Sequence, residues 1–116
     1  MTIAVLLLGL SAGVLSSLLG VGGGIILVPG MMYLLKIPTK IAIGTSLAVI
    51  IPTAVIGVYK HSINGNVNWK VTLLISLGTI TGAYLGATLN EMLPAAAIRK
   101  IFVLLLIVMA IKIWRG

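Results

Sequence analysis

A glycine-rich run interrupts the longest apolar stretch of the chain. Residues 20–24 read Gly-Val-Gly-Gly-Gly, and they lie in a stretch without charged side chains from Thr2 to Leu35. Glycine in a helix interior costs about 1 kcal/mol relative to alanine, so this run is predicted to break a helix. Irregular backbone at membrane depth is tolerated only where it is buried in protein or lines a cavity. Because a broken helix presents free backbone N–H groups, we expect an anion-binding site at this break.

The composition indicates an integral membrane protein. Of the 116 residues, 60% are hydrophobic and only 8% are charged, and the mean hydropathy is +1.29. A soluble domain usually needs about a quarter charged residues to cover its surface. Apolar segments that cross a bilayer are helices or closed barrels, and runs of this length favour helices. We therefore predict an all-α, multi-pass protein of the cell (cytoplasmic) membrane.

The chain divides into four apolar segments separated by short polar turns. Each of the last three has close to the ~20 residues that cross the hydrocarbon core. The first is too long for one straight crossing: it either crosses once as two half-helices or enters and returns as a re-entrant hairpin, and both interpretations stay open. The prediction is a four-segment helical bundle forming one transmembrane domain over residues 1–116. The segments are Ile3–Leu35, Ile41–Tyr59, Val71–Leu89 and Ala96–Trp114.

The net charge of +7 arises from eight Lys and Arg residues against the single acid Glu91. Basic residues here flank apolar runs, which favours anchors at lipid head groups over nucleic-acid binding. Under either topology of the first segment the basic residues divide four against four between the two sides of the membrane. A charge bias near zero between the two sides is compatible with insertion in both orientations and with an antiparallel homodimer. The alternative is that the count hides a real preference for one orientation. One side has Lys36, Lys40, Arg99 and Lys100, and the other has Lys60, Lys70, Lys112 and Arg115.

Two rows of small residues predict close helix contacts. Gly78, Gly82 and Gly86 recur every fourth residue and therefore share one helix face. Such a strip favours packing within the chain or a dimer seam over a role in lining a pore. A similar row in the first segment, Gly9-Gly13-Ser17-Gly20, has the same interpretation.

Residues able to do acid–base chemistry are scarce. The chain has one acid, one His and no Cys, which argues against an enzyme and against a metal site, and no cofactor is expected. His61 is expected to be a solvated residue in the loop after Tyr59. In the second segment, Thr45 and Ser46 either bond back to their own helix or reach towards the glycine break. An anion would then be held by backbone N–H groups, helix dipoles and hydroxyls.

These motifs resemble those of the sulfite exporter TauE/SafE family of membrane transporters. The resemblance covers nearly the whole chain, although family members are usually about twice as long and built from two related halves. Asn68 stands where the family pattern often has Asp. The matching motifs are Leu19-Gly20-Val21-Gly22-Gly23-Gly24 with Val28-Pro29, Ala42-Ile43-Gly44-Thr45-Ser46-Leu47, Gly65-Asn66-Val67-Asn68-Trp69, Gly78 through Gly86, and Ile98-Arg99 with Phe102.

The resemblance implies secondary, alternating-access transport of a small anion, such as a sulfur-containing oxyanion or an organosulfonate. It implies a homodimer, or a pairing with a sister half, in the lipid bilayer. By position, Gly22, Gly23 and Gly24 would form the backbone anion cradle, and Thr45 and Ser46 would be hydroxyl donors. The alternatives are a passive small-anion channel of the dual-topology dimer type and a non-transporting membrane subunit. A small multidrug exporter is disfavoured because the first segment has no Glu.

Overall fold

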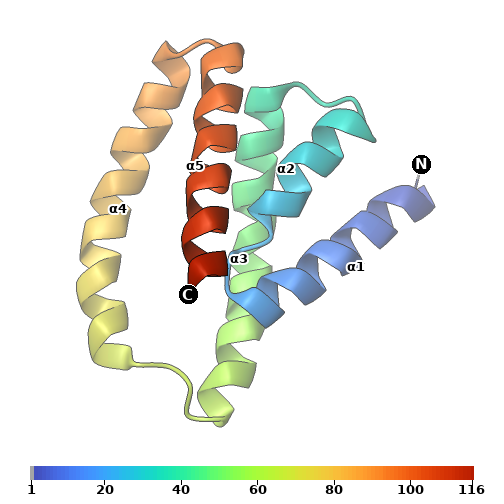
Figure 1. The fold of residues 1–116 in the computed structure, drawn as a ribbon. Coiled ribbons are helices and arrows are strands. Elements are labelled where there is room, and N and C mark those ends of the chain that lie inside the picture. Colours follow the sequence, from blue (N-terminus) through green and yellow to red (C-terminus); the bar gives the residue numbers. More distant parts are fainter. Residues whose placement is uncertain (1) are drawn as a thin grey trace. The chain divides into compact units, whose positions relative to one another are not determined.

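The protein is all-α, as predicted. The computed structural model describes residues 2–116, which form five helices and no strand. The chain divides into two compact units, residues 1–72 and 73–116. The helices are α1 (Thr2–Leu19), α2 (Gly24–Tyr33), α3 (Thr39–Ile63), α4 (Trp69–Met92) and α5 (Ala95–Arg115) (Figure 1).

Three of these helices, α1, α3 and α4, are long and apolar enough to cross a membrane, judged by length and composition over residues 2–116. The expectation of four such segments is therefore not met by α5. Every 18-residue window of α5 contains Arg99, Lys100 and Lys112. Charged groups near helix ends extend their long side chains towards the interface, so the uncharged part of α5 is only its centre.

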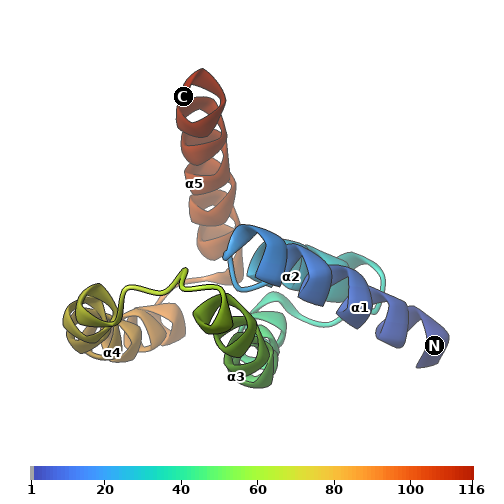
Figure 2. The same ribbon diagram turned by 90° about the horizontal axis from the view of Figure 1, so that it is seen from below.

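The first apolar segment folds back on itself at the glycine run. Helix α1 ends at Leu19 and α2 begins at Gly24. A Cβ added at Gly30 would lie 2.5 Å from Leu8 Cδ1, and one added at Gly23 would lie 3.4 Å from Ser16 Cβ. Later residues of α2 thus meet earlier residues of α1, so the two helices run in opposite directions (Figures 1 and 2). This geometry agrees with a hairpin and differs from two half-helices in line.

The core of the first unit lies where α1, α2 and α3 pack against one another. Ala12 of α1 is 2% exposed and Ala42 of α3 is 0% exposed, so small side chains bring these helices close to α2. The contact row of α1 is Leu8-Ala12-Ser16. The predicted row through Gly9 and Gly13 lies beside it, because a Cβ at either glycine would meet nothing within 4 Å. The buried hydrophobic residues are Ala12, Leu27, Met31 and Ala42.

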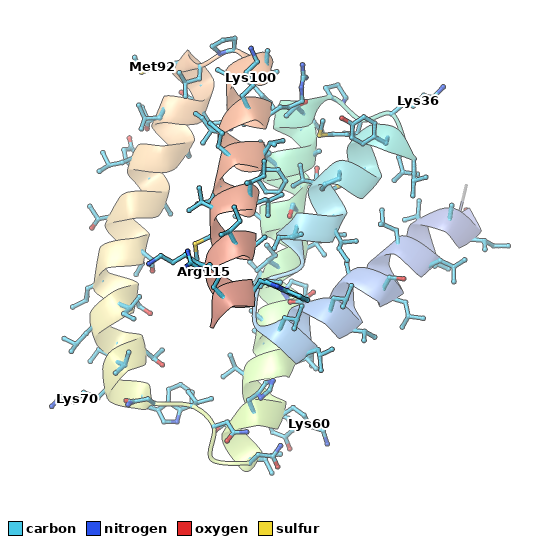
Figure 3. The ribbon with its side chains drawn as sticks, viewed as in Figure 1. Lys36, Lys60, Lys70, Met92, Lys100 and Arg115 are labelled. Carbon is cyan, nitrogen blue, oxygen red and sulfur yellow. The ribbon has the colours of Figure 1, made fainter. Side chains whose placement is uncertain are left out.

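The basic residues of the first unit lie at helix ends. Lys36 follows α2, and Lys60 lies in the last turn of α3, at the opposite end of this unit (Figure 3). Within this unit, Lys36 and Lys60 thus flank apolar helices, as the sequence predicts. This arrangement is typical of anchors at the two faces of a bilayer.

The second unit contains most of α4 and all of α5. Neither helix has a buried residue anywhere in its described range. A Cβ added at Gly78, Gly82 or Gly86 would meet nothing within 4 Å, so the predicted small-residue strip of α4 is an open surface of this chain. Such a surface is available to lipid or to another protein chain.

Candidate functional site

Backbone N–H groups without a backbone acceptor lie at the N-terminus of α2. Gly22 and Gly23 have φ values of +78° and +77°, a left-handed conformation that glycine adopts without the steric cost of a Cβ. The N–H groups of Ile26 and Leu27 donate to the carbonyl of Gly23. Among the described residues, no backbone hydrogen bond has the N–H of Gly22, Gly23 or Gly24 as its donor. Of these, the N–H groups of Gly23 and Gly24 are among those that a helix start leaves for a ligand.

Two buried serines flank this helix start. Ser16 of α1 is 7% exposed and Ser46 of α3 is 3% exposed. A Cβ added at Gly23 would lie 3.4 Å from Ser16 Cβ, and one added at Gly24 would lie 3.5 Å from Ser46 Oγ. Neither side chain makes a hydrogen bond within residues 2–116, where no fully buried side-chain oxygen lacks a partner. Both oxygens therefore keep some accessible surface; Ser16 lines the two cavities described next, whereas Ser46 lines neither.

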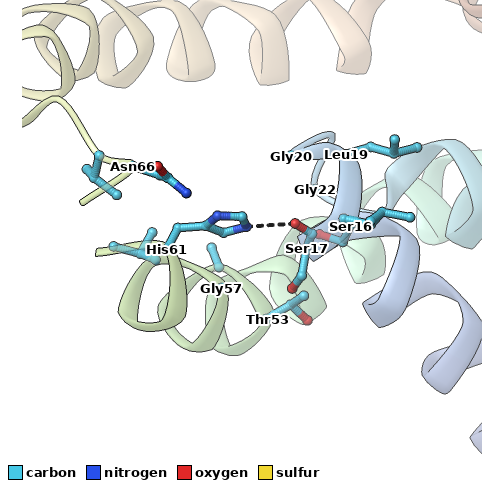
Figure 4. Close-up of a pocket in the computed structure, with 13 residues that line it drawn as sticks. Ser16, Ser17, Leu19, Gly20, Gly22, Thr53, Gly57, His61 and Asn66 are labelled. Atoms are coloured by element: carbon cyan, nitrogen blue, oxygen red, sulfur yellow. Dashed lines mark hydrogen bonds between the residues drawn. The ribbon is translucent and has the colours of Figure 1, made fainter. Parts of the chain in front are cut away.

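A hollow of about 420 Å³ opens beside the helix start (Figure 4). A much smaller cavity of about 10 Å³ lies further in, and Ser16, Gly22 and Thr53 line both spaces. The smaller cavity is close to the lower limit for a single water molecule. The hollow thus has room for a small molecule, whereas the inner cavity does not. Thr53 Oγ1 donates to the carbonyl of Val49 at 3.0 Å, which leaves its oxygen available as an acceptor only.

A hydrogen bond between α1 and α3 joins two residues that line the hollow. His61 Nε2 lies 2.8 Å from the carbonyl oxygen of Ser17 (Figure 4). Because a carbonyl only accepts, Nε2 has the proton of this bond. His61 was expected in a loop, but α3 continues to Ile63 and His61 lies in its last turn. Sequence reasoning placed the helix end too early, since the polar residues after Tyr59 suggested a loop.

The turn after α3 places Asn66 beside His61. Asn66 N–H donates to the carbonyl of His61 at 2.9 Å, and Gly65 N–H donates to that of Ser62 at 3.0 Å. With Gly65 at φ +72°, these two bonds form a Schellman motif at the end of α3. The Asn66 side chain extends towards the imidazole in Figure 4. The Asn-Gly turn at residues 64–65 therefore holds a second polar side chain at the mouth of the hollow.

The predicted site residues are only partly brought together. Gly22, Gly23 and Gly24 form the start of α2, and Ser46 lies against it. Thr45 is exposed on α3 and lies outside the lining of the hollow. Neighbouring helix positions point about 100° apart, so Thr45 and Ser46 could not both face the break.

Sequence reasoning did not propose Ser16, Ser17 or His61 as site residues. The fold-back of α2 brings Ser16 to the glycine run, although only a few residues separate the two in sequence. The spacing of Ala12, Ser16 and Leu8 at intervals of four was the available signal. His61 is 44 residues from Ser17 along the chain, so its position depends on how α3 packs.

The chain matches the sulfite exporter TauE/SafE family over residues 1–115. It belongs to this family. The match to the TauE/SafE family confirms the resemblance read from the glycine run and the Ala-Ile-Gly-Thr-Ser-Leu motif. Three helices long and apolar enough to cross a bilayer agree with membership in this family of multi-pass membrane proteins.

Several curated proteins similar to the chain are named probable membrane transporter proteins. The chain is 36% identical to YunE of Bacillus subtilis over 101 residues, covering 87% of this chain and 37% of the relative. It is 31% identical to one from Methanocaldococcus jannaschii, covering 91% of this chain and 42% of the relative. It is 32% identical to one from Haemophilus influenzae, and the match covers 92% of this chain and 43% of the relative. The chain thus spans about two fifths of these relatives. No solved structure matches it.

Proposed function

We propose that this chain is one half of a secondary transporter for a small anion, a sulfur-containing oxyanion or an organosulfonate. In this proposal residues 1–116 correspond to one repeat of a two-repeat transporter. A second copy, or a sister half, supplies the other repeat. The chain's coverage of about two fifths of its relatives supports this arrangement. Alternating access would then proceed by movement of one half against the other around a shared site.

The observation that carries the proposal is the helix start at Gly22–Gly24 with Ser16 and Ser46 beside it. Backbone N–H groups and hydroxyls are donors, and the N-terminal end of α2 has a partial positive charge. Residues 2–35 have no charged side chain that would bind an anion instead. Donors without full charges suit a transporter, since a hydrogen bond to a charged ligand contributes about 1.5–3 kcal/mol. A few such bonds hold an anion without trapping it.

A flux assay on the full chain in liposomes tests this proposal. It compares sulfite, thiosulfate, a small sulfonate and fluoride, with and without imposed proton or sodium gradients. Saturable, gradient-dependent movement of a sulfur anion is the expected result, and it would also name the coupling ion. Fast movement that ignores the gradients would replace the transporter by a passive channel. Absence of flux, with no recovery on adding a second half, would indicate a non-transporting subunit.

The dimer is tested separately by cross-linking in the bilayer. We expect a dimer whose contacts include the open Gly78–Gly86 strip of α4. Cysteines can be introduced for this purpose without background, because the chain has none. Cross-links between α4 positions on two copies would support pairing, and a monomer that transports would contradict it.

A further inference from the structure

The hollow beside the glycine run has one ionisable side chain. Of the residues in 2–116 that line it, only His61 can change its charge near neutral pH. Its Nε2 proton is already used by the carbonyl of Ser17, at 2.8 Å. The second ring nitrogen, Nδ1, is therefore an acceptor in the neutral form. When it takes up a proton it becomes a donor on a cationic ring.

The surroundings of His61 contain little competing charge. Helix α1 has no ionisable side chain, and α2 has only Tyr33, at its far end. On α3 itself the others are Lys40, at the opposite end, Tyr59, and Lys60 next to His61. None of these lines the hollow. An anion entering the hollow would therefore find its one switchable positive charge at His61.

Distance along the hollow separates this histidine from the helix start. His61 and Asn66 belong to the outer lining, while Ser16, Gly22 and Thr53 line both the hollow and the inner cavity. Figure 4 shows the imidazole on the side of Asn66, and Gly20 and Gly22 on the opposite side. His61 therefore lies in the part of the hollow away from the inner cavity.

We infer that His61 is a second anion-binding residue, at the mouth of the hollow, and that it binds the anion in its protonated form. The inference rests on the proposed function of anion transport. Anion and proton then load together, so the apparent affinity for the anion rises as pH falls through the range in which histidine titrates, about pH 5 to 8. The Asn66 side chain, which also lines the hollow, offers an amide donor beside the ring.

The direct test is the nuclear magnetic resonance titration of the imidazole in the full-length wild-type protein in nanodiscs. The chain has a single histidine, so its ring signals need no assignment. The probe is a small sulfonate, whose own charge does not change near neutral pH. We expect the midpoint of the His61 titration to move to higher pH on adding the sulfonate. A shift of about one pH unit would mean tenfold tighter binding to the protonated form. An unchanged midpoint at saturating sulfonate would overturn the inference.

The transport readout uses His61→Gln, which keeps a donor for the Ser17 carbonyl but does not titrate. Its KM should be independent of pH and equal to the wild-type value at high pH. The matched control, Lys60→Gln, removes the neighbouring charge and should keep the wild-type pH dependence. If His61→Gln retains that dependence, His61 is not the anion-binding residue.

These outcomes separate the inference from the function on which it rests. A shifted midpoint without saturable flux would overturn transport by this chain and leave the His61 site standing. Saturable flux with an unshifted midpoint would leave the transporter standing and remove His61 from the site.

Discussion

The conformation of Gly23 makes a quantitative prediction about transport. Gly23 is buried and has φ +77°, where a residue with a Cβ costs roughly 1–2 kcal/mol. A Cβ there would also lie 3.3 Å from the carbonyl oxygen of Ala12 and 3.4 Å from Ser16 Cβ. Gly23→Ala therefore adds a backbone cost and pushes α1 away from the start of α2.

Gly20→Ala is the matched control for this variant. Gly20 has φ +73°, but a Cβ there would meet nothing within 4 Å. Both variants should lose about the same backbone energy, and only Gly23→Ala should disturb the helix start. Each 1.4 kcal/mol corresponds to a tenfold change in an equilibrium. We expect Gly23→Ala to reduce kcat/KM for the anion more than tenfold beyond Gly20→Ala.

The assay measures flux in liposomes at matched amounts of inserted protein, with thermal stability in detergent measured alongside. Gly23→Leu should abolish transport altogether while still inserting into the membrane. Equal flux in Gly20→Ala and Gly23→Ala would refute the reasoning, because the two variants differ only in what the added Cβ meets.

The other predictions concern single contacts. Ser46→Ala should weaken anion binding by about 1.5–3 kcal/mol, or about ten- to a hundredfold in KM, whereas the exposed Thr45→Ala should not; an equal loss in both would contradict the role of Ser46. Gly30→Ala and Leu8→Ala should have non-additive effects on the thermal midpoint, because a Cβ added at Gly30 would meet Leu8 Cδ1; strict additivity would argue against their contact. Gly82→Leu should weaken dimer cross-linking more than anion affinity, and an unchanged oligomer would remove α4 from the seam.

Helix positions followed from the sequence more closely than the contacts between helices did. Polar turns between long apolar runs predicted α3 and α4 to within a few residues at each end, since lipid-facing segments must close their own hydrogen bonds. The break at residues 20–23 followed from glycine's poor helix propensity. The segment predicted at Ala96–Trp114 agrees with the ends of α5, but its charged residues Arg99, Lys100 and Lys112 keep it outside the helices apolar enough to cross a membrane.

The fold-back and the mouth of the hollow could not be read from the sequence. Gly9 and Gly13 looked like the contact row of α1, but Ala12 and Ser16 are the residues that meet α2. Small residues occupy both rows, so composition alone does not choose between them. The pairing of His61 with Ser17 depends on the angle at which α3 crosses α1, which no local pattern encodes.

The turn at residues 20–23 joins the end of one helix to the start of another. The carbonyl end of α1 has a partial charge of about −0.5, and the amide end of α2 has about +0.5. When no anion is bound, these opposite ends offset each other over a few residues. The break can then persist in an apolar segment without a counter-ion or a charged side chain. In the proposed transporter, a bound anion would disturb this neutrality, so the electrostatic cost of the site would fall on the loaded protein and favour release.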